Sequence, residues 1–349
     1  MSSHSGRNDL TPEPLISLGL GFWGPKTLLS AVELGVFTLL AQHAPLELEA
    51  LRERLGLHPR GARDFLDVLV ALGLLDRDAR GYRNTPLSDM YLDQNKPTYI
   101  GGLFEMAEAR LYPFWSKLTD GLRSGEPQNE VRHGGDFFGI LYSDPRRLKL
   151  FLQAMTGVSF ASARAIAEKF PFGRYSTVID LGCAQGCVPA QVAMRHPHIS
   201  GGGFDLPVVQ PIFEEYVEEL GLSDRLVFHP GNFFEDPLPP ADVYVMGHIL
   251  HDWNLEQKLA LLRKAFEALP PGGALIVYES LIDDDRRENL IGMLMSLNML
   301  IETPGGFDYT GADCRGWMQQ VGFRETRVEH LAGPDSMVVA LKAARGCEI

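Results

Sequence analysis

The pattern of apolar residues divides the chain near residue 170. From about Pro14 to Phe170 apolar residues recur at helical spacing, and the run LLSAVELGVFTLLAQ is almost continuously apolar. A helix that is apolar nearly all round is either buried or paired with another chain. From about Tyr175 onward, short β-type runs alternate with helical runs. That alternation predicts right-handed βαβ units and a parallel sheet with helices on both faces.

Part of the first half resembles a winged helix. The runs LELEALRERLGL, HPRGARDFLDVLVALGLLDRD and GYRNTPLSDMYL read as short helices, a longer apolar helix and a strand–turn–strand tail. Such a unit either binds DNA or holds two chains together. The segment from His58 to Leu72 is rich in Leu, Val and Phe, and its basic residues lie at one end only. We therefore favour a mainly helical dimerisation domain at 11–170, followed by an α/β domain at 171–349.

Seven strands are expected in the second half. Their sequences are STVIDLG, GGGFDL, RLVFHPG, DVYVMGH, ALIVYES, RETRVEHL and SMVVALK. Helical runs separate the earlier strands, which suits parallel pairing. The last two have no crossover helix between them, so we expect a hairpin at the sheet edge.

Composition narrows the choice of partner and compartment. The chain has 349 residues and a formal net charge of −13, which argues against a nucleic-acid partner. Its four cysteines are few, and Cys183 and Cys187 lack the spacing of a redox pair or zinc knuckle. The polar start MSSHSGRNDLTPEP is not a signal peptide, and no apolar run reaches the length of a membrane span. We expect a cytoplasmic enzyme with reduced thiols and no membrane contact.

The first strand of the α/β domain ends in a small-residue loop, DLGCAQG. Ligands of open α/β sheets bind beyond the carboxyl ends of the strands. Gly182 and Gly186 allow a sharp turn and a close approach of the backbone. Ala184 and Cys187 occupy two of the three glycine places of a dinucleotide loop. The loop suits S-adenosylmethionine (SAM) better, because SAM has no pyrophosphate to bind.

Two later strand ends add cofactor candidates. Asp205 follows the next strand, about 20 residues after the glycine loop, where an acid accepts hydrogen bonds from ribose hydroxyls. This feature is common to NAD and SAM sites and does not separate them. The run beginning at Gly231 offers an amide at Asn232 for the adenine edge and a ring at Phe233 for its face.

The run HILHDW, after the fourth strand, carries the candidate base His251. A sulfonium methyl donor is already activated, whereas a phenolic acceptor with a pKa near 10 is mostly neutral at pH 7. A histidine is the usual base for such a proton, and a carboxylate on its other nitrogen fixes the tautomer. Glu279 and Asp308 are both candidates for that carboxylate. Asp252 is a third acid of the site, with a helix-start role as the competing interpretation.

Further residues of this half allow other chemistry. His248, His251 and Asp252 could supply metal ligands, but their spacing is a weak metal signal and we expect no metal. On the run NLIGMLMSLNMLIE, Met295 and Met299 share a helix face and form either an acceptor wall or ordinary core.

The motifs VIDLGCAQG, FDLP, GNFF-DPLP, ILHDW, LPPGG-LIVYES, SLNML and PGGFDYT occur in that order. In this respect the chain resembles the plant-type small-molecule O-methyltransferases, a family with caffeate, acetylserotonin and bacterial tailoring members. The resemblance runs from about Leu15 to Lys342. It implies a winged-helix dimerisation domain, a Rossmann-like SAM domain and a homodimer in which one chain lines part of its partner's pocket.

The resemblance also implies roles for individual residues. It matches His251 to the base, Glu279 and Asp308 to its flanking acids, and Asp205 to the ribose ligand. For the cofactor, which leaves as S-adenosylhomocysteine, we predict Ser159, Asp180, Gly182, Gly186, Asp205, Leu206, Gly231, Asn232, Phe233, Gly247 and His248. For the acceptor we predict Trp115, Met155, Met295, Asn298 and Met299.

Several positions depart from the family's usual residues. Cys183 and Ala184 replace two loop glycines, and Asn232 stands where Asp is usual. Asp308 replaces a frequent Glu, and Gly247 replaces the Lys of many plant members.

Three functions are compatible with these residues. The leading prediction is methyl transfer to the hydroxyl of a small aromatic acceptor in secondary metabolism. One alternative is C-methylation of a 2-oxo acid or activated ring carbon on the same scaffold. The other is a SAM-sensing, DNA-binding regulator, against which the acidic charge and the HDW motif argue.

Overall fold

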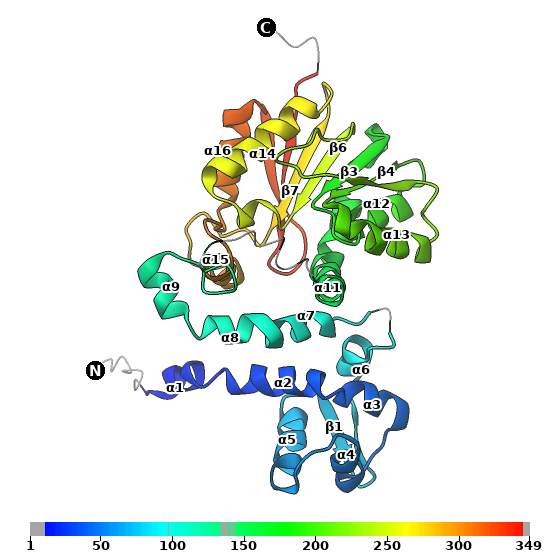
Figure 1. Cartoon of the computed structure of the whole chain (residues 1–349), viewed down its shortest axis with the longest axis vertical. Helices are drawn as coiled ribbons and strands as arrows, with labels where there is room; N and C mark the ends of the chain where they lie inside the picture. The colour runs from blue at the N-terminus through cyan, green and yellow to red at the C-terminus, as the bar shows by residue number, and fades with distance from the viewer. Residues whose placement is uncertain are drawn as a thin grey trace, which may run out of the picture. The chain divides into compact units, whose positions relative to one another are not determined.

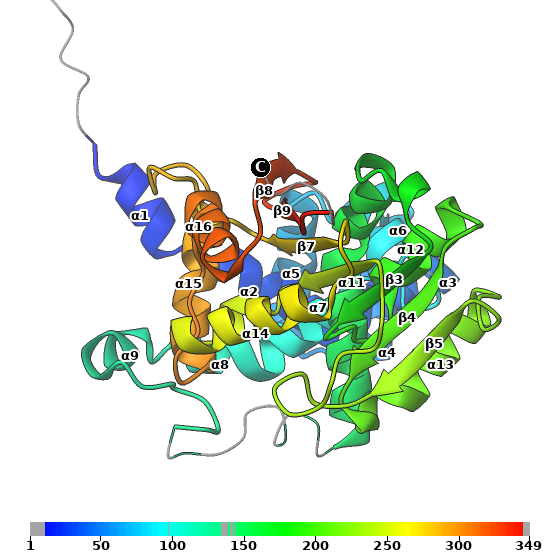
Figure 2. The ribbon, with the colours of Figure 1, turned by 90° about the horizontal axis from the view of Figure 1, so that it is seen from above.

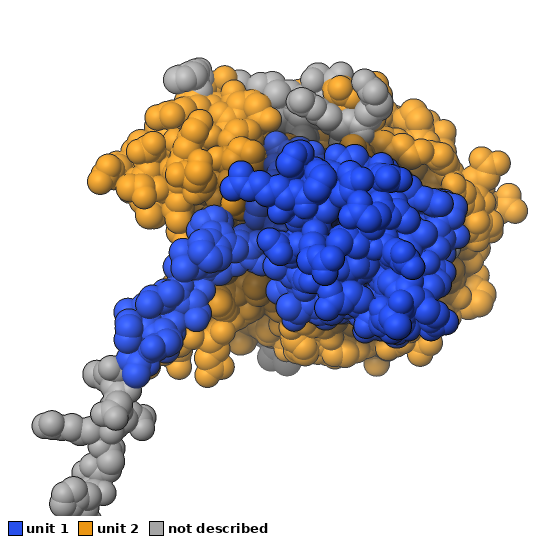
Figure 3. Space-filling view, turned by 90° about the horizontal axis from the view of Figure 1, so that it is seen from below, with its two compact units in different colours: residues 1–109 blue, residues 110–349 orange. Residues whose placement is uncertain are grey.

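The computed structural model describes residues 11–344 except 97, 133, 135–138, 140, 141 and 143. The polar start up to Leu10 and Cys347 lie outside the described residues. The chain forms two compact units, residues 1–109 and 110–349, coloured separately in Figure 3. The domain boundary predicted after residue 170 falls inside the second unit.

The first unit is mainly helical (Figure 1). Its elements are α1 (Glu13–Gly19), α2 (Trp23–Glu33), α3 (Val36–His43), α4 (Leu48–Arg54), α5 (Pro59–Ala71), β1 (Leu75–Asp78), β2 (Gly81–Asn84), α6 (Pro86–Leu92) and α7 (Gly101–Met106). Strands β1 and β2 pair antiparallel directly after α5, as the winged-helix pattern predicts.

The apolar run LLSAVELGVFTLLAQ does not form one continuous helix. Gly35 adopts a left-handed φ of 68° between α2 and α3, a conformation that glycine tolerates. Leu29, Val32, Phe37 and Leu40 on either side of this break are buried in the unit's own core. Of the two alternatives for this run, burial or pairing with another chain, burial is the one that these residues show.

The exposed apolar residues lie earlier in the chain. Helix α1 has no buried residue, and it forms an arm of the first unit together with the start of α2 (Figure 3). Leu15, Leu18 and Trp23 are 74%, 80% and 59% exposed. Exposed apolar side chains gathered in this way indicate a surface that contacts another protein or a membrane.

The second unit is a three-layer α/β structure (Figures 1 and 2). A π-helical turn, Ala107–Leu111, joins α7 to α8 (Tyr112–Trp115), and α9 (Leu118–Ser124) follows. The remaining helices are α11 (Pro145–Lys169), α12 (Cys187–Arg195), α13 (Gln210–Glu219), α14 (Leu255–Ala268), α15 (Leu290–Glu302) and α16 (Gly311–Val321). Short 3₁₀ turns are η2 (Phe172–Arg174), η3 (Pro207–Val209) and η4 (Leu250–Asp252).

All seven predicted strands form one sheet, in the order β5-β4-β3-β6-β7-β9-β8. They are β3 (Thr177–Leu181), β4 (Ser200–Asp205), β5 (Leu226–Pro230), β6 (Val243–Gly247), β7 (Ala274–Glu279), β8 (Glu325–His330) and β9 (Ser336–Leu341). The first five are parallel, and β8 and β9 form the expected antiparallel edge hairpin.

Alternate residues of the central strands enter different cores. Ile179 and Tyr244 pack with α14 and α16 on one face. Val178 and Val243 pack with α11 and α12 on the other. Burial on both faces explains why these strands are apolar throughout, and it fixes the register that brings the strand ends to one edge.

Two helical stretches are long and apolar enough, by length and composition, to cross a membrane: Glu13–Glu33 and Leu148–Lys169. This differs from the sequence expectation, which considered uninterrupted apolar runs. Buried helices of soluble proteins pass the same test, and Leu148, Leu152 and Ile166 of the second stretch are core residues. The absence of membrane contact stays a prediction.

Candidate active site

A pocket lies at the carboxyl ends of the parallel strands of the second unit. It is lined by ten of the eleven predicted cofactor residues: Ser159, Asp180, Gly182, Asp205, Leu206, Gly231, Asn232, Phe233, Gly247 and His248. The eleventh, Gly186, is not part of its lining. The sheet thus brings together residues spread over about 90 positions of sequence, because parallel strands end at the same edge.

The glycine loop after β3 needs small residues at defined places. Gly182 has a φ of 77°, and a Cβ there would lie 2.2 Å from the Ile249 side chain. Gly186 has a φ of 87°, and its Cβ would lie 2.4 Å from Phe213. Between them Ala184 also has a positive φ, 49°, although it is not glycine. The replacement of a family glycine by alanine therefore keeps the backbone conformation.

Asp205, at the end of β4, fixes this loop. Its carboxylate accepts the backbone N–H of Ala184 at 3.0 Å and that of Leu206 at 2.7 Å. Burial raises the pKa of Asp205 to about 6, against the opposing effect of these two donors. Each carboxylate oxygen has further acceptor capacity, so the side chain is able to hold the loop and bind ribose hydroxyls together.

Aromatic rings form another wall of the pocket. Phe233 lies edge-on to Trp253, with centroids 5.9 Å apart. The side-chain oxygen of Asn232 accepts the N–H of Phe234 at 2.9 Å, which shapes the turn. Such a wall suits the face of a flat heterocycle.

His251 is buried in η4 among three acids. Its Nδ1 donates to Oδ1 of Asp308 at 3.3 Å and lies 3.6 Å from Oε2 of Glu279. Its backbone N–H donates to Oε1 of Glu279 at 3.3 Å. Asp308 is thus the nearer acid to the ring, and Glu279 also holds the backbone. The aspartate is long enough for this contact despite replacing a glutamate.

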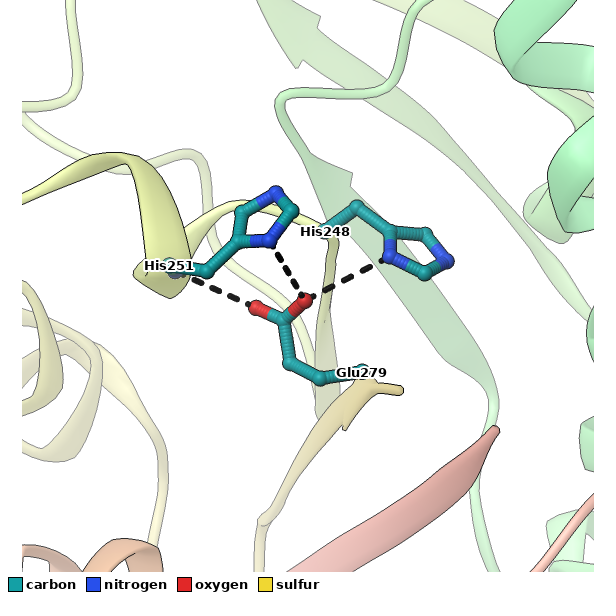
Figure 4. Close-up of side chains that lie close together, drawn as sticks. All are labelled: His248, His251 and Glu279. Atoms are coloured by element: carbon teal, nitrogen blue, oxygen red, sulfur yellow. Dashed lines mark hydrogen bonds and ion pairs between the residues drawn. The ribbon is translucent and has the colours of Figure 1, made fainter. Parts of the chain in front are cut away.

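The two imidazoles of the HILHDW segment converge on one carboxylate (Figure 4). Nδ1 of His248 lies 3.4 Å from Oε2 of Glu279, the same oxygen that Nδ1 of His251 approaches. Polar atoms of these three residues all lie within 4.8 Å of one another. Each imidazole also faces a second carboxylate, so we interpret the cluster as a network of paired charges. That the reaction needs no metal stays a prediction.

The acids around His251 change its protonation. Burial alone would lower the pKa of His251, but Glu279, Asp252 and Asp308 raise it to about 10. The pKa of Asp252 is raised to about 6, mainly by burial. The imidazole is therefore charged at neutral pH before substrates bind, with a proton affinity close to that of a phenolate.

Asp252 belongs to the site and does not cap a helix. Its Oδ1 lies 3.7 Å from Nε2 of His251, and its side chain lines the pocket. Asn254 caps α14, since its side chain accepts the N–H of Gln257. The helix-start interpretation of Asp252 is therefore wrong.

The predicted acceptor residues fall into two groups. Met155 lines the pocket. Trp115, Met295, Asn298 and Met299 are not part of its lining, but Nε1 of Trp115 donates to Oδ1 of Asn298 at 2.8 Å. This hydrogen bond links α8 to α15 within the second unit.

The structure adds residues that the sequence did not single out. Lys258 of α14 is fully buried, and its ammonium donates to the carbonyl of Phe307 at 3.0 Å, next to Asp308. Asp335, in the turn before β9, faces His248. Neither position lies in a recognisable motif, so only the fold reveals them. Trp253, in contrast, ends the HILHDW run, so the motif itself could have identified it as a pocket residue.

Comparison with known proteins gives two family matches. The O-methyltransferase domain matches residues 115–324, and the O-methyltransferase dimerisation domain matches residues 16–94.

The similarity to individual known proteins covers nearly the whole length of this chain. The tetracenomycin polyketide synthesis 8-O-methyl transferase TcmO of Streptomyces glaucescens is 45% identical, over 95% of this chain and 97% of the relative. The N,N-dimethyltransferase OxyT of Streptomyces rimosus is 37% identical, over 94% and 96%. Human N-acetylserotonin methyltransferase, solved in complex with SAM, superposes with a TM-score of 0.88 at 30% identity, covering 99% of this chain and 100% of that one.

Proposed function

The chain belongs to the O-methyltransferase family, and from that premise we propose that it methylates a phenolic hydroxyl of a polycyclic aromatic acceptor, with His251 as the base. Its methyl donor is SAM. The observation that carries the proposal is the buried His251–Asp308 pair beside a pocket with a SAM-type loop.

The pocket residues fit the cofactor. At Gly182 and Gly231 an added Cβ would lie 2.2 and 2.7 Å from side-chain atoms. This part of the pocket wall therefore requires glycine at both positions. Asp205 would hold the ribose, Phe233 would lie against the adenine, and Ser159 would lie near the methionine moiety. When bound, SAM supplies a methyl group that is already activated by its sulfonium charge.

His251 then has one task, which is to accept the acceptor's proton; it does so in its neutral form, which a pKa of about 10 makes a minor form at pH 7. With Nδ1 directed at Asp308, the hydroxyl would meet Nε2, which lies 3.7 Å from Oδ1 of Asp252. The pKa of about 10 for His251 matches that of an ordinary phenol, so transfer of the proton between them is close to thermoneutral. Asp308 and Glu279 stabilise the imidazolium that results.

Two observations favour a hydroxyl acceptor over an amine. The 45% identical relative is named a polyketide 8-O-methyl transferase. OxyT, which is named an N,N-dimethyltransferase, is less similar, at 37% identity. The second observation is the buried His251–Asp308 pair. A neutral amine attacks a sulfonium without prior loss of a proton, so a pre-formed His–Asp pair has its main use with hydroxyls. The methylation would be one step in the biosynthesis of an antibiotic.

We assign the dimer contact to the arm formed by α1 and the start of α2. The dimerisation domain match covers residues 16–94, and the arm exposes Leu18, Phe22 and Trp23. A second copy of the chain would cover these side chains. The described cysteines, Cys183, Cys187 and Cys314, are free and buried, which suits the cytoplasm.

The direct test is purified protein with labelled SAM and three panels of acceptors: polycyclic phenols, the corresponding aryl amines, and 2-oxo acids. We expect label in the phenols, at an oxygen identified by fragmentation in mass spectrometry. Label in the amines alone would replace O-transfer by N-transfer. Label at carbon would favour the C-methylation alternative.

A further inference from the structure

Lys258 carries a buried charge that the proposed proton transfer does not use. It is fully buried and shares the inner face of α14 with Leu261, Leu262 and Ala265. Burial lowers the pKa of its ammonium to about 8, so the charged form predominates at pH 7. A buried ammonium is costly unless polar groups surround it. Its partners therefore indicate what it does.

The ammonium of Lys258 connects two separate segments of the chain. It donates to the carbonyl of Trp253, the residue after η4, and to the carbonyl of Phe307 at 3.0 Å. It also lies 3.6 Å from the centroid of the Phe307 ring, within the range of a cation–π contact. The first segment carries His251, and the second leads directly into Asp308. One side chain thus joins the segment of the base to the segment of its nearer acid.

These two segments pack backbone against backbone. A Cβ added at Gly306 would lie 2.5 Å from the carbonyl oxygen of His251 and 2.8 Å from the carbonyl carbon of Asp252. A glycine contributes no side-chain packing that could fix the spacing of the two segments at this point. The His251–Asp308 hydrogen bond, at 3.3 Å, is longer than is usual for N–H···O. Its geometry therefore depends on how the two backbones are held.

We propose that Lys258 is a positioning residue that sets the distance between His251 and Asp308 and so keeps the base oriented toward the acceptor. This role rests on the proposed function of His251. Lys258 is not part of the pocket lining, and it acts through the carbonyls of Trp253 and Phe307. Above pH 8 the neutral amine still has two N–H groups, one for each carbonyl, so the link persists where His251 loses its proton.

The test is Lys258→Met, because methionine fills a similar space and has no N–H donor. Rates are measured at about pH 8 with a phenol of pKa near 10 and with a phenol that is already ionised. We expect kcat for the neutral phenol to fall about 10- to 100-fold, since a misplacement of about 1 Å has an effect of this size. The ionised phenol should react at near the wild-type rate, because it needs no base. SAM affinity should not change.

Two further variants control for folding. Arg263→Met, at an exposed position of the same helix, is the matched control and should keep both rates. Lys258→Gln keeps N–H donors on a side chain that is one atom shorter, so its loss should be smaller and again confined to the neutral phenol. If thermal melting shows that Lys258→Met does not fold, Lys258→Gln decides the question.

Nitrogen-15 NMR of histidine-labelled protein observes the His251–Asp308 contact without any methyl transfer, and His251→Asn assigns the signals of the His251 ring. In Lys258→Met we expect the Nδ1–H signal of His251 to shift and to exchange faster with water. An unchanged signal, no loss with the neutral phenol, or an equal loss with both phenols would overturn the proposal. If His251→Asn keeps the wild-type rate, the base assignment fails, and the NMR signal alone then decides whether Lys258 sets the contact.

Discussion

Asp308→Asn isolates the charge on the acid that orients His251. Asparagine has the same shape, and its carbonyl oxygen is able to accept the Nδ1 proton that Asp308 now accepts at 3.3 Å. Both side chains are almost fully buried, at 7% and 1% exposure. The substitution thus removes one charge and keeps the orientation of the His251 ring unchanged.

The magnitude follows from the distance. Two unit charges 3.3 Å apart at an effective dielectric constant of about 20 interact with about 5 kcal/mol, or three to four pH units. The pKa of His251, now about 10, should fall toward its ordinary value, while Glu279 and Asp252, the larger causes of its rise, still raise it. Because the neutral ring is the base, kcat/KM should stop rising at a lower pH in Asp308→Asn than in the wild type. Its plateau should be lower, since a weaker base accepts a phenol's proton less readily.

The assay is steady-state methylation of one neutral phenol between pH 6 and pH 10, with thermal melting to verify the fold. Asp285→Asn, an exposed acid after β7, serves as the control and should reproduce the wild-type profile. If Asp308→Asn lowers the rate by one factor at every pH, the acid acts on position alone and the electrostatic reasoning is refuted.

Three other predictions concern the cofactor, the metal and the dimer. Asp205→Ala should weaken SAM binding by about 10- to 100-fold in calorimetry, because it removes charged hydrogen bonds worth about 1.5–3 kcal/mol; unchanged affinity would exclude Asp205 as the ribose ligand. EDTA should leave the rate unchanged, and loss of activity that Mg²⁺ restores would show that a metal is needed. Leu18→Glu in the exposed arm should give monomers by light scattering, whereas an intact dimer would move the contact elsewhere.

The fold could be predicted from the sequence because its signals are local. The strands β3, β6 and β7 are buried along nearly their whole length, and helical runs follow β3, β4 and β6, which leaves a parallel sheet as the consistent arrangement. The glycine loop and HILHDW then fall at strand ends, where ligands bind. The break at Gly35 shows the limit of this reasoning, because hydrophobic spacing alone gave one helix where a left-handed glycine makes two.

The network around His251 is less accessible to sequence analysis. Asp335 lies in a hairpin turn and Lys258 on an ordinary amphipathic helix, and both reach the site only through packing. Spacing also could not rank Glu279 against Asp308, since the difference is 3.6 Å against 3.3 Å in three dimensions. The side-chain arrangement of the predicted acceptor region, including the Trp115–Asn298 contact, depends likewise on how α8 packs against α15.

The central claim is that His251 removes the acceptor's proton. The most direct measurement compares kcat for wild type and His251→Asn over a series of phenols whose pKa values run from about 10 down to about 6, with SAM affinity measured in parallel. We predict a loss of about 10²-fold or more for the least acidic phenol, a loss that shrinks toward none for phenols already ionised at the assay pH, and unchanged SAM binding. A near-wild-type rate on the least acidic phenol would contradict the account, because methyl transfer would then rest on proximity alone.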